Sequence, residues 1–176
     1  MTNPFSIQNL APTWAIADVG KASVLKGDLP GHEFHGNQFT SAEANRESRA
    51  IASQSSRVRQ AESHTDIRSA HANSHSSLAM RHADVGNSLN HAYHMTFQHP
   101  DIENNKDLQD LARGLHLAAQ AHFAASKAHS DIASGNYDYS HGQGEARRDE
   151  AEALSHAAAM ATSDPQTLGR RANDGY

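Results

Sequence analysis

The strongest constraint on the fold is a stripe of apolar, small and histidine side chains that recurs every three or four residues. Leucine, alanine, histidine and isoleucine share positions 108, 111, 115, 118, 122, 125, 129 and 132. This spacing keeps the side chains on one face of an α-helix, where they can pack against a neighbouring helix. The sequence therefore predicts a helix over about 106–134, which the Gly135-Asn136 pair ends.

A similar stripe precedes it, at positions 64, 68, 71, 75, 78, 82, 85, 89, 92 and 96. Thr40 and Glu43 have the spacing of a capping box, in which each side chain bonds the backbone N–H of the other residue. We therefore expect one long helix from Ser41 to about His99, which Pro100 stops. Gly86 is its expected weak point because glycine disfavours a helix interior.

A third helix is predicted from about Glu145 to Thr162, with Ala151, Leu154, Ala158 and Ala161 on its buried side. Residues 1–40 contain three prolines and four glycines without a sustained hydrophobic period, which is typical of an extended arm. The predicted fold is all-α: an extended N-terminal arm (1–40), an antiparallel three-helix bundle with one long first helix (41–163), and an irregular C-terminal tail (164–176).

Composition favours thin helices that pack closely. The chain has 30 alanines but only 26 leucine, isoleucine, valine and phenylalanine residues among 176. A core of this kind is weak by itself, so we expect stabilisation from a homo-oligomer or a partner. The absence of cysteine excludes disulfides and thiolate chemistry. A net charge of −5 without a basic stripe argues against nucleic-acid binding at neutral pH, and the sequence predicts no membrane span.

Histidine is the unusual component of the two stripes, which we call the seam. The six seam histidines are His64, His71, His75, His82, His122 and His129. We interpret them as packing residues that each bond a neighbouring polar group, and burial is expected to lower their pKa values. The alternative is a metal site formed by His71, His75, His122 and His129, since two of these are four residues apart. No carboxylate joins the seam as in di-metal bundles, so no cofactor or metal is expected.

No catalytic motif emerges. The string His32-Glu33-Phe34-His35 is one residue too short for the zinc-protease pattern, in which the two histidines share a helix face. The chain has neither a Gly-x-Ser-x-Gly elbow nor a Gly-rich phosphate loop. We therefore expect a structural or binding protein rather than an enzyme.

The segment from Leu29 to Thr40, LPGHEFHGNQFT, resembles a short motif of tailed-bacteriophage structural proteins: Pro-Gly-His-x-Phe-x-Gly-Asn-Gln, then an aromatic residue and threonine. In those proteins Ala-rich helices with regularly spaced histidines commonly follow, as in residues 118–129 here. The Gly-rich spacer that often follows the motif is missing from this chain.

This resemblance implies a minor, head-associated component of a virion, made in the host cytoplasm. The arm would bind other capsid or head subunits through Trp14, Leu29, Pro30, His32, Phe34, His35, Asn37, Gln38 and Phe39. The alternative is a phage-encoded helical module that binds metal or a small ligand such as an anionic nucleotide, using the seam histidines with Arg68 or Arg81.

Overall fold

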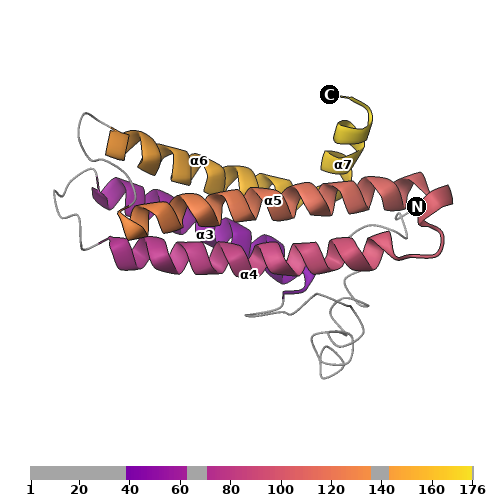
Figure 1. Ribbon diagram of the computed structural model, residues 1–176, viewed down its shortest axis with the longest axis horizontal. Coiled ribbons are helices and arrows are strands. Elements are labelled where there is room, and N and C mark those ends of the chain that lie inside the picture. Colours follow the sequence, from indigo (N-terminus) through magenta and orange to yellow (C-terminus); the bar gives the residue numbers. More distant parts are fainter. Residues whose placement is uncertain (1–38, 63–70, 136–142, 176) are drawn as a thin grey trace, which may run out of the picture.

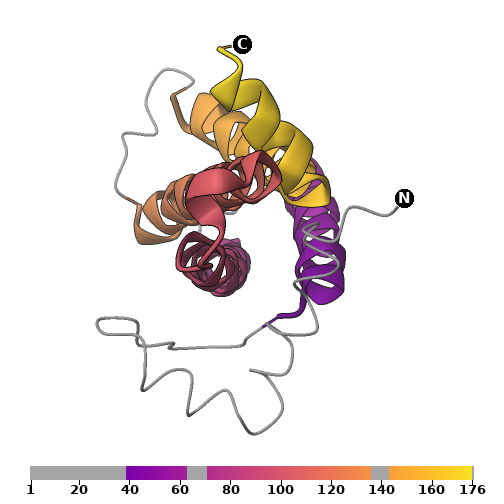
Figure 2. The ribbon, with the colours of Figure 1, turned by 90° about the vertical axis from the view of Figure 1, so that its right-hand side faces the viewer.

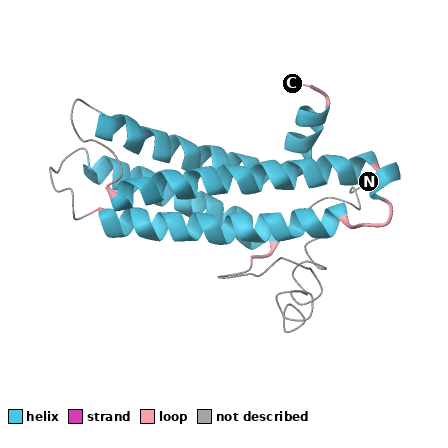
Figure 3. Ribbon diagram, viewed as in Figure 1, coloured by secondary structure: helices cyan, strands magenta, loops and turns pink. Residues whose placement is uncertain are grey.

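A computed structural model describes residues 39–62, 71–135 and 143–175. These residues form helices and connecting loops, with no strand among them (Figure 3). The elements are α3 (Ser41–Glu62), α4 (Ala72–Phe97), the 3₁₀ turn η2 (Ile102–Asn104), α5 (Lys106–Ser134), α6 (Gln143–Ser163) and α7 (Pro165–Asn173). The predicted all-α class is confirmed.

The four long described helices run side by side, and α7 packs against α5 near one end of the bundle (Figure 1). Successive helices are antiparallel, so α3 and α5 share one direction and α4 and α6 the other. Viewed along the bundle, they surround a common interior (Figure 2). Each helix can therefore direct one face toward the other three.

The expected continuous helix from Ser41 to His99 is wrong. The described helix α3 ends at Glu62, α4 begins at Ala72, and α3 packs against both α4 and α6. A continuous helix would carry residues 41–62 about 30 Å beyond these partners and leave their buried face in water. Nor does Gly86 interrupt α4, where it is buried. The described bundle thus has four long helices instead of three.

The ends of the helices follow local signals in the sequence. The predicted capping box is confirmed, since the Thr40 N–H donates to Glu43 Oε2 at 2.9 Å and the Glu43 N–H donates to Thr40 Oγ1 at 3.2 Å. The helix α5 has the predicted bounds. Asn105 caps its start by accepting a bond from the Leu108 N–H, and Gly135 ends it in the left-handed conformation at φ 67°.

The predicted stripes form the interior faces of α4 and α5, where all their members from position 75 onward are buried. The aliphatic core includes Ile51, Leu78, Leu89, Leu111 and Leu115. The predicted face of α6 is partly wrong. Ala151 and Ala158 are buried, but Leu154 and Ala161 lie at the boundary and Ser155 and Thr162 are buried in their place. Ser155 and Thr162 are buried because their hydroxyls bond interior histidines, and an apolar period in the sequence does not reveal such bonds.

The C-terminal segment was expected to be irregular, and this is wrong for α7. The Asp164 side chain accepts a bond from the Thr167 N–H at 3.1 Å, and Pro165 occupies the first turn, where its missing N–H costs nothing. The backbone of α7 lies directly against that of α5. A Cβ added at Gly169 would fall only 1.7 Å from the Asp110 carbonyl oxygen. Two glycines, Gly114 and Gly169, permit this approach.

The arm up to residue 38 and the seam residues His64 and Arg68 lie outside the described residues. None of the described helices combines the length and the apolar character needed to cross a bilayer.

Candidate functional site: a chain of buried histidines

Every long helix places a polar residue in the interior at intervals of seven, which is two helical turns. These residues are Ser48, Ser55 and Glu62 on α3; His75 and His82 on α4; His122 and His129 on α5; and Arg148, Ser155 and Thr162 on α6. The intervening core positions are mainly alanine, leucine, isoleucine and valine. The polar residues therefore meet in successive layers along the axis of the bundle.

The first histidine pair lies near the end where α4 begins and α5 ends. His75 Nδ1 is hydrogen-bonded to His129 Nδ1 at 2.8 Å, and the ring centroids are 5.0 Å apart. The other nitrogen of His75 bonds Glu62 Oε1 at 2.6 Å. His129 Nε2 lies 2.9 Å from Ser155 Oγ and 3.4 Å from Ser55 Oγ. Both ring nitrogens of each histidine are thus engaged.

The second pair repeats this geometry two helical turns away. His82 Nδ1 is hydrogen-bonded to His122 Nδ1 at 2.9 Å, again with centroids 5.0 Å apart. His122 Nε2 lies 3.0 Å from both Ser48 Oγ and Thr162 Oγ1. His82 Nε2 bonds Ser155 Oγ at 2.9 Å. The four imidazoles are therefore held by polar groups from all four long helices.

Ser155 joins the two pairs, since its hydroxyl contacts one histidine of each. It also donates to the Ala151 carbonyl at 2.8 Å. The rings of His82 and His129 stack directly, with centroids 5.7 Å apart and planes 15° from parallel. We call His75, His129, His82 and His122, linked through Ser155, the histidine chain.

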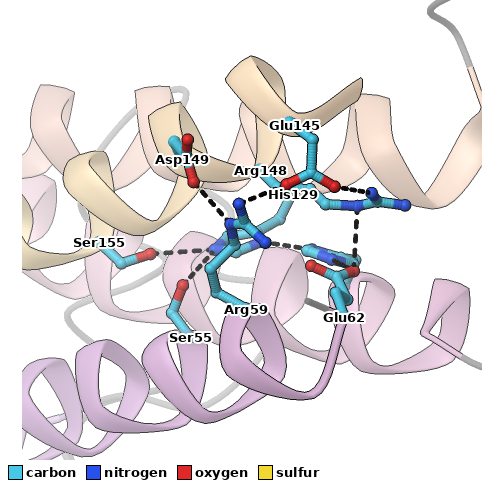
Figure 4. Close-up of polar contacts among 9 residues, drawn as sticks. Ser55, Arg59, Glu62, His129, Glu145, Arg148, Asp149 and Ser155 are labelled. Atoms are coloured by element: carbon cyan, nitrogen blue, oxygen red, sulfur yellow. Dashed lines mark hydrogen bonds and ion pairs between the residues drawn. The ribbon is translucent and has the colours of Figure 1, made fainter. Parts of the chain in front are cut away.

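An ion-pair cluster closes the Glu62 end of the histidine chain (Figure 4). Arg148 Nε lies 3.5 Å from Glu62 Oε1, and Arg148 Nη1 lies 3.2 Å from Glu145 Oε1. Arg59 contributes a second guanidinium, which contacts Glu145 and lies 2.6 Å from Asp149 Oδ1. The Glu62 side chain is only 2% exposed, so Arg148 provides the positive charge that a buried carboxylate requires.

Burial makes the interior imidazoles poor proton acceptors. It lowers the pKa of His122 from 6.5 to about 4. It also lowers the pKa of His82 to about 3, with His122 and Arg81 adding charge repulsion. The pKa of His129 is about 3 for the same main reason, with His75 and His82 as repulsive neighbours. All three rings are therefore neutral at pH 7.

The four residues of the alternative metal site do not converge. His75 and His129 bond each other, but His122 is paired with His82, and His71 lies at the N-terminus of α4. Within the described residues, no group of three or more His, Asp or Glu side chains is arranged to hold a metal ion. Arg81, a proposed ligand contact, bonds Glu47 and Gln54 instead.

Sequence reasoning missed the partners of the histidines: the serines and threonine, Glu62 and Arg148. One available signal was their spacing, since residues 48, 55 and 62 and residues 148, 155 and 162 are seven apart, like 75 and 82 or 122 and 129. Four parallel sets of polar residues at intervals of seven indicate layers in a bundle interior.

A surface hollow of about 620 Å³ lies at the opposite end of the bundle, between the end of α4, η2, the start of α5 and the end of α7. Its lining includes the aromatic rings of Tyr93 and Phe97 and the cationic side chains of Lys106 and Arg113. It is separate from the histidine chain.

No protein-family model, curated protein or solved structure matches this chain. Function must therefore be argued from the helical bundle and its interior.

Proposed function

We propose that this protein is a minor, non-enzymatic structural component of a bacteriophage particle, associated with the head. Its bundle is an oligomerising body, and the arm of residues 1–40 attaches it to other virion subunits. The histidine chain has an architectural role in this proposal, because its imidazole nitrogens are already bonded to interior groups and to each other.

The observation that carries the proposal is the junction between the phage-like motif and the bundle. Phe39, the final aromatic residue of the motif, donates its backbone N–H to Ser88 Oγ on α4 at 3.1 Å. Its side chain packs against the aliphatic core. Thr40, the next motif residue, caps α3. A motif that binds a neighbouring subunit through the arm would thus transmit that attachment directly to the folded body.

Mass spectrometry of purified virions tests the proposal, with wild-type protein compared with a variant lacking residues 1–38. The truncated protein is expected to keep its helical circular dichroism but to be absent from particles or to lose its oligomeric state. A double substitution, Trp14→Ser with Phe34→Ser, should have the same effect. The matched control is Met160→Ser, because the Met160 side chain is exposed on α6. Normal incorporation of the truncated protein would refute an anchoring arm.

The second candidate is a helical module that binds an anionic nucleotide, and the surface hollow favours it. Tyr93 and Phe97 offer faces for a base, and Arg113 offers charge for a phosphate. The carboxylates of Glu103, Asp110 and Asp174 also line the hollow, and Asp174 pairs with Lys106. Calorimetric titration with a nucleoside triphosphate tests this function. Binding that Arg113→Ser abolishes would support it, and no heat of binding at millimolar nucleotide would reject it.

A further inference from the structure

The direction of the hydrogen bonds within the first histidine pair follows from Glu62. A carboxylate only accepts, so the 2.6 Å bond to Glu62 is donated by His75 Nε2–H. A neutral imidazole carries one N–H, and therefore His75 Nδ1 is an acceptor. The bond between the two Nδ1 atoms must then be donated by His129, which leaves His129 Nε2 as an acceptor.

Ser155 joins the first pair to the second. His129 Nε2 accepts a hydroxyl hydrogen from Ser155 at 2.9 Å or from Ser55 at 3.4 Å. The Ser155 hydroxyl also lies within hydrogen-bonding distance of His82 Nε2 and of the Ala151 carbonyl oxygen, and it has one hydrogen to donate. The neutral first pair therefore has one tautomer pattern, Nε2–H on His75 and Nδ1–H on His129, whereas in the second pair a single hydrogen lies between the two Nδ1 atoms.

The first pair can take up one proton without losing a hydrogen bond. As a cation, His75 donates Nε2–H to Glu62 and Nδ1–H to His129. His129 then changes tautomer and donates Nε2–H to Ser155, whose own hydroxyl donates to the Ala151 carbonyl. The new charge lies against the Glu62 carboxylate, so it forms a compensated ion pair.

The second pair has no such compensation. The groups that face it from the neighbouring helices are hydroxyls and the stacked His129 ring, and the nearby charge is the cation Arg81. Arg81 is itself paired with Glu47. A proton on His82 or His122 would thus be an uncompensated charge in the interior, which is costly.

We propose that Glu62 divides the histidine chain into two acid responses: the His75–His129 pair accepts a proton while the bundle stays folded, and protonation of the His82–His122 pair opens it. The charged groups around the first pair are Glu62 from α3 and, beyond it, Arg148 and Glu145 from α6. Arg59 and Asp149 complete this cluster (Figure 4). The inference does not depend on a role in a virion.

Nitrogen-15 NMR of the imidazoles, in the full chain from pH 8 to pH 4, tests the proposal directly. At pH 8 His75 should carry its hydrogen on Nε2 and His129 on Nδ1. On acidification His75 should become an imidazolium while amide signals of the folded bundle persist, and His82 and His122 should titrate only together with the loss of those signals. Simultaneous titration of all four rings with unfolding would overturn the proposal.

The variant Glu62→Gln removes the compensating charge but keeps a polar group of the same size. The imidazolium signal of His75 should then appear only together with the loss of the folded amide signals, because its charge in the interior would lack a partner. Glu47→Gln is the matched control, since this carboxylate lies on the same helix but pairs with Arg81. A His75 imidazolium in the folded state of both variants would refute the role of Glu62. If Glu62→Gln does not fold, the order in which the four imidazoles take up protons in the wild-type protein still tests the proposal.

Discussion

Acid should unfold this bundle over a narrow range of pH, because three of its buried histidines cannot charge without leaving the interior. The pKa values of His82 and His129 are about 3 and that of His122 is about 4 in the folded protein, whereas an unfolded imidazole titrates near 6.5. The unfolded chain therefore binds more protons below pH 6.5. Stability is then full above about pH 7 and falls as the pH drops through 6.5 toward 4.

The size of the effect follows from proton linkage. At pH 5 each of the three histidines is almost fully protonated when unfolded and almost fully neutral when folded. Linkage then gives a loss of about 2 kcal/mol per histidine relative to pH 7.5, or about 6 kcal/mol for all three. A domain of ordinary stability has about 5 to 15 kcal/mol, so this loss is enough to unfold a thin, alanine-rich core.

Urea denaturation followed by circular dichroism at pH 7.5, 6.5, 6.0, 5.5 and 5.0 measures this loss. Between pH 6 and pH 5 the free energy of unfolding should fall by about 3.5 kcal/mol, which corresponds to uptake of about 2.6 protons on unfolding. The double variant His82→Leu with His122→Leu should reduce that fall to about 1.2 kcal/mol, since only His129 then remains. Replacing both partners avoids leaving either imidazole without its bond.

The control for this experiment is His156→Gln, since His156 lies half-exposed on α6 outside the histidine chain. It should leave the slope of stability against pH unchanged. Equal wild-type stability at pH 5 and pH 7.5 would refute the reasoning. A double variant with the wild-type slope would also refute it, because groups other than His82 and His122 would then account for the proton uptake on unfolding.

Three further predictions concern the contact between α5 and α7, the start of α3, and metal binding. Gly169→Ala should lower stability by about 1 to 3 kcal/mol, measured by thermal melting, because its Cβ would overlap the Asp110 carbonyl oxygen. Thr40→Ala should cost about 1 kcal/mol in the same assay through loss of the capping box. Treatment with a chelator should leave the Tm unchanged, and zinc or nickel should raise it by no more than a few degrees, because interior hydrogen bonds occupy the imidazole nitrogens.

Each of these has a control or a contrary outcome. Gly175 has nothing within 4 Å but has φ +84°, a conformation that asparagine adopts more readily than most residues, so Gly175→Asn should cost less than Gly169→Ala. Thr40→Ser should retain the cap that Thr40→Ala loses. A large rise in Tm with zinc would show that the histidines exchange their mutual bonds for metal ligation and would favour the ligand-binding alternative.

The helix at residues 106–134 and the helical character of residues 72–97 could be predicted because their signals are local. A buried stripe of period 3.6 and a cap need only residues within a few turns of one another, and the predicted interior faces of α4 and α5 are those of the structure. The same local logic found the capping box at Thr40. The pair Asp164-Pro165 is likewise a local signal for the start of a helix, and it marks the start of α7.

By itself, then, the sequence determined that the chain is helical and which faces of its two best-patterned helices are buried. Only the tertiary structure decided that α3 and α4 run antiparallel instead of forming one helix, and what the buried histidines bond. The reason is that a buried imidazole takes its partners from other helices: Ser48 and His122 are 74 residues apart, and Ser155 meets His82 across the interior. Periodicity specifies the face that is buried, whereas the partner depends on which faces the folded chain brings together.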